Sequence, residues 1–138
     1  MATNMDTIIS KLEKKKTKSG FLVEFLKRTE LNTPNTEFSL IYVVKILPGN
    51  ISGNHFHKEK TEWMSIFNGK VNVVLEDVKT KEREEFVLDS SKELTRLLIR
   101  KGLAHAFKNI SNKDVILVAY SDKIYDPENS DTYDYKLL

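Results

Sequence analysis

The chain consists mainly of short apolar runs, rich in Val, Ile, Phe and Tyr, that turn residues separate. From Gly20 onward no helical pattern stands between these runs. Some seven to nine short strands without interleaved helices predict an all-β protein, either a sandwich or a small barrel. Periodicity leaves both architectures open. The expected strands are Phe21–Leu26, Phe38–Leu47, Glu62–Phe67, Lys70–Val78, Glu84–Leu88, Leu94–Ile99 and Val115–Ser121, and His55–His57 can add another.

The turns between these runs are marked by glycine, proline and asparagine. Asn68-Gly69 is the strongest of these signals, because both residue types tolerate a positive φ. We therefore expect a hairpin between the runs Glu62–Phe67 and Lys70–Val78. Pro48-Gly49-Asn50 and Ser111-Asn112-Lys113 mark two further turns.

The length of 138 residues suits one domain. We expect residues 19–138 to form it, and residues 1–18 to form a basic arm or a short helix. The helical alternative rests on Thr7–Lys16, whose apolar residues share one helical face. The arm reading rests on five nearby lysines, Lys11, Lys14, Lys15, Lys16 and Lys18.

Composition excludes several functional classes. With 22 basic and 20 acidic residues, a net charge of +2 gives no electrostatic case for nucleic-acid binding. No apolar run is long enough to span a membrane, and no N-terminal stretch resembles a secretory signal, so a cytoplasmic location is expected. The chain contains no cysteine, which excludes disulfides, a cysteine nucleophile and thiolate metal ligands.

The three histidines of the chain and one glutamate form a coherent pattern. His55 and His57 stand at i and i+2, so a strand would place both on one face, about 7 Å apart. Glu62 begins the next apolar run across a short turn, and His105 follows later in an apolar context. Three imidazoles and a carboxylate suit Zn, Fe(II), Mn, Ni or Co. Zinc is the first expectation, because it needs no protection from redox chemistry.

The spacing around these residues resembles two known motifs. Gly49-x5-His55-x-His57-x4-Glu62-x6-Gly69 resembles the first cupin motif, and Gly102-x2-His105-x3-Asn109 resembles the second. The second motif normally has a proline two residues before its glycine, where this chain has Arg100. The resemblance implies an antiparallel cupin jelly-roll barrel, a double-stranded β-helix, with the four ligand candidates inside.

A narrower resemblance covers nearly the whole chain. The segment 20–26 resembles the opening strand of nucleotide-sugar 3,5-epimerases. The segments 53–57 and 125–133 are similar to the C-terminal cupin domain of bifunctional capsular polysaccharide synthesis enzymes. This implies epimerisation at carbon 3, or at carbons 3 and 5, of a UDP- or dTDP-4-keto-6-deoxyhexose, without a redox cofactor. Glu24 and Asn54 are then candidates for substrate contacts, although Glu24 also suits a charge on the barrel rim.

Two mechanisms fit these residues, and both begin with removal of a proton beside a ketone. In the metal-free version His55 is the base and Tyr125 returns the proton on the opposite face. In the metal version His55, His57, Glu62 and His105 hold the ion, the ion or Lys60 stabilises the enolate, and another group is the base. The complete ligand set favours the metal version. Lys60 is alternatively a contact of the diphosphate.

Three other functions stay open on the sequence. An Fe(II) oxygenase would use the same four ligands. A sugar 3,4-ketoisomerase would share the segment 53–57, although that subgroup lacks the glutamate at the position of Glu62. A non-catalytic sugar-binding cupin would regulate a partner instead. The resemblance also implies a homodimer, whose interface the apolar strands near the N-terminus can supply, and a separate reductase as a partner.

Overall fold

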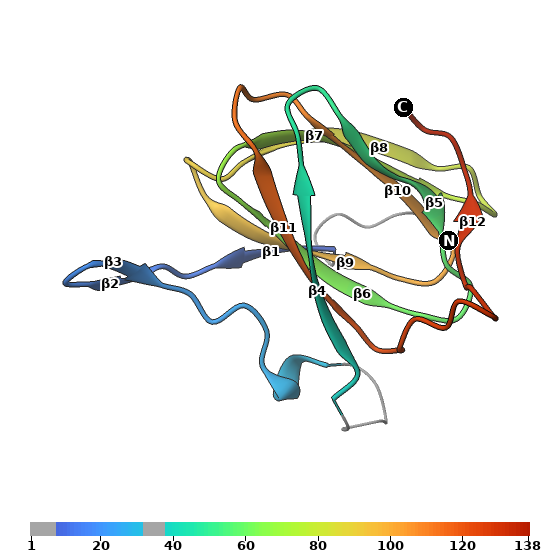
Figure 1. Cartoon of the computed structure of the whole chain (residues 1–138), viewed down its shortest axis with the longest axis horizontal. Helices are drawn as coiled ribbons and strands as arrows, with labels where there is room; N and C mark the ends of the chain where they lie inside the picture. Colours follow the sequence, from blue (N-terminus) through green and yellow to red (C-terminus); the bar gives the residue numbers. More distant parts are fainter. Residues whose placement is uncertain (1–7, 32–37) are drawn as a thin grey trace.

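The computed structural model describes residues 8–31 and 38–138 and folds them into two facing five-stranded sheets (Figure 1). One sheet has the strand order β1-β9-β6-β11-β4, the other has the order β12-β5-β10-β7-β8, and β2 and β3 form a separate hairpin. All pairings are antiparallel. The elements are β1 Ile9–Leu12, β2 Lys15–Thr17, β3 Gly20–Leu22, η1 Arg28–Glu30, β4 Leu40–Ile46, β5 Ile51–Phe56, β6 Glu62–Phe67, β7 Lys70–Asp77, β8 Arg83–Asp89, β9 Leu94–Ile99, β10 Leu103–Asn109, β11 Val115–Ser121 and β12 Tyr133–Asp134.

From β4 to β11 the chain crosses from one sheet to the other at nearly every turn, and only β7 and β8 form a hairpin within a sheet. This alternation is the jelly-roll arrangement, so the all-β expectation is confirmed in its barrel form. Inward-facing side chains of both sheets meet in one core. Its members include Met64, Ile66, Val71, Val73, Leu97, Ile99, Phe107 and Leu117.

The hairpin predicted at Asn68-Gly69 is wrong. Both residues have a positive φ, 62° and 136°, as the turn requires. However, β6 pairs with β9 and β11, whereas β7 pairs with β8 and β10 in the opposite sheet. The dipeptide therefore reverses the chain but does not choose the partner strand. Burial decides this, because β6 and β7 contribute to the same core from opposite sides.

The helix considered for Thr7–Lys16 is also wrong from Ile9 onward; Thr7 lies outside the described residues, and Ile8 alone is helical. Ile9–Leu12 is strand β1, paired with β9, and Lys15–Thr17 is strand β2. Ile9 lies opposite Leu97 and packs against the core. Tertiary pairing outweighs a short and weak helical periodicity here.

Strand β10 is absent from the strands expected from the sequence. It contains two alanines, a histidine and a lysine but no β-branched residue, so its local β signal is weak. It lies between β5 and β7 and is almost wholly buried. Pairing with β5 and β7, together with burial, therefore makes this segment a strand.

The N-terminal hairpin β2–β3 projects from the barrel (Figure 1). The segment after it is fixed to the first sheet by Arg96, whose guanidinium donates to the carbonyl of Phe25 at 2.9 Å and contacts Glu30 at 3.0 Å. In the part of the chain that the structure describes, no helix is long and apolar enough to cross a membrane.

Candidate metal and substrate site

The three histidines come together at one end of the second sheet. His55 on β5 and His105 on β10 are register partners, and His57 follows directly after β5. One nitrogen of each ring lies within 4.8 Å of the others. His57 and His105 are buried and His55 is half-buried. The structure thus brings together all three residues that the sequence proposed as nitrogen ligands.

Gly53 allows the two histidine strands to approach each other. Its φ is +104°, and a Cβ there would lie 2.5 Å from the carbonyl oxygen of His105. The pairing of β5 and β10 shifts register beside this point, between His105 and Ala106. A side chain at position 53 would therefore move the two strands apart at the site.

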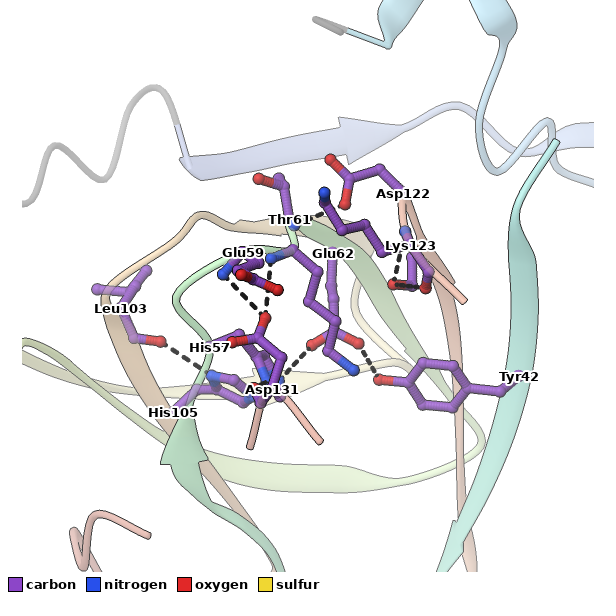
Figure 2. A network of polar contacts seen from close by, with 12 residues as sticks. Tyr42, His57, Glu59, Thr61, Glu62, Leu103, His105, Asp122, Lys123 and Asp131 are labelled. Atoms are coloured by element: carbon purple, nitrogen blue, oxygen red, sulfur yellow. Dashed lines mark hydrogen bonds and ion pairs between the residues drawn. The ribbon is translucent and has the colours of Figure 1, made fainter. Parts of the chain in front are cut away.

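Glu62 is the fourth member of the cluster (Figure 2). It begins β6 in the opposite sheet and is only 1% exposed. Its Oε1 lies 2.9 Å from Nε2 of His57, and its Oε2 accepts a hydrogen bond of 2.5 Å from the hydroxyl of Tyr42. The cluster therefore spans both sheets, and the carboxylate touches one histidine directly.

Backbone carbonyls fix the orientation of two of the rings. Nδ1 of His57 lies 2.7 Å from the carbonyl of Asp131, and Nδ1 of His105 lies 3.0 Å from that of Leu103. A carbonyl oxygen only accepts, so each Nδ1 carries the proton. Nε2 of His105 is then the nitrogen available to a ligand, and it is buried without a hydrogen-bond partner among the described residues. Nε2 of His57 and Oε1 of Glu62 face each other at 2.9 Å, and neither atom has another polar contact among the described residues.

Electrostatics keep this cluster in a state that suits a cation. Burial, followed by the charge of His55, lowers the pKa of His105 to about 4. Burial and then the charge of His57 also lower the pKa of His55. Burial alone would raise the pKa of Glu62, but its contacts with His57 and Tyr42 prevail and hold it at about 2.

The lowered pKa values keep His55 and His105 neutral beside an ionised Glu62, as a divalent metal requires of its ligands. The buried Nε2 of His105, which has no partner among the described residues, would gain one from such an ion. The residues present therefore fit a metal bound by His55, His57, Glu62 and His105.

Lys60 lies beside this cluster. Its side chain is half-buried, and its charge lowers the pKa of His55, after the larger effects of burial and His57. Tyr125, by contrast, is 55% exposed. Within the described residues no hydrogen bond or ring contact joins Tyr125 to the histidines. The structure thus associates Lys60 with the site but leaves Tyr125 outside the polar network.

The two proposed substrate contacts have other partners in this structure. Glu24 follows the exposed β2–β3 hairpin and forms ion pairs with Lys15 at 3.2 Å and Lys27 at 3.3 Å. The side-chain amide of Asn54 is bound to the last residues of the chain. It accepts from the backbone of Leu137 and Leu138 and donates to the carbonyl of Leu138. Neither side chain contacts a histidine ring in the described structure.

Two residues of the cluster were not found from the sequence. Tyr42 lies on β4, where alternating burial turns its side chain inward to Glu62. The alternation of this run was visible, and an inward tyrosine could have been inferred from it. Asp131 lies in an acidic loop, 74 positions from His57. No periodic pattern marks it, so only the folded chain reveals it.

A family model and similar known proteins both relate this chain to polysaccharide biosynthesis. The chain matches the family described as the polysaccharide biosynthesis C-terminal domain over residues 15–133. It is 26% identical over 115 residues to a UDP-2-acetamido-2,6-beta-L-arabino-hexul-4-ose reductase of Pseudomonas aeruginosa. That match covers 83% of this chain but only 28% of the reductase.

Solved structures confirm the fold. The capsular polysaccharide assembling protein CapF from Staphylococcus aureus superposes with a TM-score of 0.68 at 26% identity, over 91% of this chain and 34% of CapF. The 3,5-epimerase RmlC from Legionella pneumophila, solved with dTDP-4-keto-L-rhamnose, has a TM-score of 0.79 at 19% identity, over 100% of this chain and 77% of RmlC. The chain therefore belongs to the polysaccharide biosynthesis C-terminal domain family, and it has the cupin fold of CapF and RmlC.

Proposed function

We propose that this protein is an isomerase that modifies a nucleotide sugar in polysaccharide biosynthesis. The specific reaction proposed is epimerisation at carbon 3, or at carbons 3 and 5, of a UDP- or dTDP-4-keto-6-deoxyhexose. The observation that carries this proposal is the buried cluster of three histidines and Glu62 within a cupin of a polysaccharide family. The similar reductase has a hexul-4-ose, a sugar with a ketone at carbon 4, in its name.

The chemistry requires a weakly acidic C–H, a base, and a positive environment for the enolate oxygen. A C–H beside a ketone loses its proton to a positioned base when the resulting negative charge is stabilised. A divalent metal, zinc first and Fe, Mn or Ni as alternatives, would polarise the ketone as a Lewis acid. His55, His57, Glu62 and His105 would hold it. Lys60 would bring a second positive charge to the enolate oxygen or to the diphosphate.

The proton must return from the face opposite to the one that lost it. Tyr125 remains the proposed donor, because it lies on an exposed loop from which a phenol can approach bound substrate. Tyr42 is the rival phenol, inside the barrel. Burial, and then the charge of Glu62, raise the pKa of Tyr42, so it keeps its proton as a donor to Glu62. We therefore propose that Tyr42 holds Glu62 and that Tyr125 delivers the proton.

Solvent deuterium wash-in tests the reaction. Protein is incubated in D₂O with a panel of 4-keto-6-deoxyhexose nucleotides, and deuterium at carbon 3 and inverted product are measured separately. Tyr125→Phe should still exchange the proton but should yield less inverted product, by about 10²–10⁴-fold for a lost general acid. Tyr133→Phe, at the start of β12 and stacked on Phe56, is the matched control. Absence of exchange with every sugar would reject the epimerase in favour of a binding module.

Metal analysis of the purified protein tests the choice between the two mechanisms. We expect close to one divalent metal per chain, and we expect His57→Ala to lose most of it. A metal-free protein with full activity would transfer the base role to His55. Oxygen uptake by the Fe(II)-loaded protein would instead identify an oxygenase.

We further propose a homodimer and a separate reductase as partners. Phe21 and Leu22 on the β2–β3 hairpin and Ile41 and Val43 on the edge strand β4 are each at least half exposed, which suits an interface. Reduction at carbon 4 is the reaction class that would consume an epimerised 4-keto sugar. Light scattering of the parent and of Phe21→Asp tests the dimer, and a coupled assay with a reductase tests the partner.

A further inference from the structure

The loop between β5 and β6 is bound by one acidic side chain from a distant part of the chain (Figure 2). Oδ1 of Asp131 accepts a hydrogen bond from the backbone N–H of Lys58 at 2.9 Å. Oδ2 accepts from Glu59 at 2.8 Å and from Lys60 at 3.0 Å. Three successive backbone N–H groups therefore converge on one carboxylate, an arrangement that favours an anion at this point.

The backbone of the same residue holds the adjoining histidine. The carbonyl of Asp131 accepts from Nδ1 of His57 at 2.7 Å. Asp131 thus contacts four consecutive residues, from His57 to Lys60, while Asp122 caps the next residue by accepting from the N–H of Thr61 at 2.9 Å. Every residue of the loop between His57 and Glu62 therefore donates its backbone N–H to the side chain of Asp131 or Asp122.

This contact determines which nitrogen of His57 faces the cluster. With Nδ1 committed to the carbonyl of Asp131, Nε2 points to Glu62, at 2.9 Å from its Oε1. If the tail were released, the ring could rotate and exchange its proton between the two nitrogens. Outer partners that fix a ligating histidine typically contribute about 10–100-fold to metal affinity.

We infer that Asp131 is the positioning residue of this site. Its carboxylate holds the turn at residues 58–60, and its carbonyl holds His57 with Nε2 directed at Glu62 and the other histidines. The part of this inference that concerns metal affinity rests on the proposed function, whereas the part that concerns the ring does not.

The test compares the parent with Asp131→Ala, Asp131→Asn and the control Asp126→Ala. Asp126 lies five residues before Asp131, and among the described residues its side chain accepts only from the nearby backbone N–H of Glu128. The first readout is the Nδ1–H signal of His57 in ¹H–¹⁵N spectra of the metal-free protein, together with amide exchange at residues 58–60. The second readout is zinc affinity, measured by competition with a chelating dye.

We expect Asp131→Ala to lose the protected Nδ1–H signal, to accelerate amide exchange at residues 58–60, and to bind zinc about 10–100-fold more weakly. Asp131→Asn keeps one acceptor oxygen and should fall between the parent and Asp131→Ala, and it decides the matter if the alanine variant does not fold. Asp126→Ala should match the parent in both readouts.

A protected Nδ1–H signal in Asp131→Ala would overturn the inference, as would unchanged zinc affinity where the parent binds zinc. If the parent binds none of Zn, Fe(II), Mn and Ni, the metal version of the proposed function fails. The ring signal and the amide exchange then still decide whether Asp131 positions His57.

Discussion

Glu62 and Glu24 represent two contrasting regions of this molecule, the barrel interior and the projecting N-terminal segment. Both are glutamates whose pKa is lowered by neighbouring groups. Hydrogen bonds from Lys15 and Lys27 lower the pKa of Glu24 on the open surface. At Glu62 burial opposes ionisation, yet the contacts with His57 and Tyr42 still lower the pKa to about 2.

The difference between the two carboxylates lies in their exposure to water. The side chains of Glu24 and Lys15 are 46% and 53% exposed, so water and salt screen their attraction. Glu62 and His57 are 1% and 4% exposed, so protein groups replace water around both side chains, including the direct contact between them. The contact of Glu62 is therefore much less screened than that of Glu24, and it lies at the proposed metal site. Four predictions test this contrast, in decreasing order of expected effect.

The largest effect is expected from Glu62→Gln. It removes the only charge facing His57 from β6 and one of four proposed metal ligands. We expect the metal-free protein to lose on the order of 3 kcal/mol of stability, because the buried carboxylate makes two contacts, with Tyr42 and His57, and a hydrogen bond to a charged group is worth about 1.5–3 kcal/mol. Urea unfolding in the presence of a chelator measures this loss. Zinc titration should also show a large loss of affinity. If both the stability and the zinc affinity of the variant match those of the parent, Glu62 is no more important than the exposed Glu24.

The second prediction concerns acid. The pKa of His105 is about 4 in the folded chain and 6.5 as an unperturbed group, so the unfolded chain binds the proton first as pH falls. The stability from His105 is complete above pH 6.5 and is lost as pH falls toward 4. The full loss is on the order of 3 kcal/mol. Unfolding of the metal-free protein across this range measures it, and His105→Gln should flatten the slope.

A smaller effect is expected from Tyr42→Phe. The variant keeps the ring but removes the hydroxyl that donates to Oε2 of Glu62. A buried carboxylate oxygen without its donor costs about 1–3 kcal/mol, which urea unfolding would detect. Inversion by Tyr42→Phe should fall much less than inversion by Tyr125→Phe. The reverse order would identify Tyr42 as the proton donor.

The smallest effect is expected from Glu24→Gln. The ion pairs with Lys15 and Lys27 are exposed, so the unfolding midpoint should match that of the parent at moderate salt. Zinc affinity should also be unchanged. A clear loss of substrate affinity with normal stability would instead support the substrate contact proposed for Glu24, for example within a dimer.

The sequence allowed the fold class and most of the site to be predicted, because these depend on short-range patterns. Glu62–Phe67 and Leu94–Ile99 were predicted with the bounds that the structure gives to β6 and β9. Alternation predicted that His55 and His57 share one side of a strand, and the structure brings them together although β5 ends at Phe56. The two motifs then supplied His105 and Glu62 as their companions. The hairpin at Asn68-Gly69 failed because the sequence does not show which strands pair, and the helix at Thr7–Lys16 and the missed strand β10 failed because tertiary pairing outweighs weak local signals.

By itself the sequence determined the β character of the chain and the residue types that can bind an ion, because strand alternation and ligand chemistry are local properties. Only the tertiary structure decided that β6 and β7 join opposite sheets, that Glu24 pairs with Lys15 and Lys27, and that Tyr42 and Asp131 contact Glu62 and His57. Asp131 and His57 are 74 residues apart, and Tyr42 and Glu62 lie on strands separated in the first sheet by β11. Such contacts arise when the two sheets close over a common core, and no short-range periodicity encodes them.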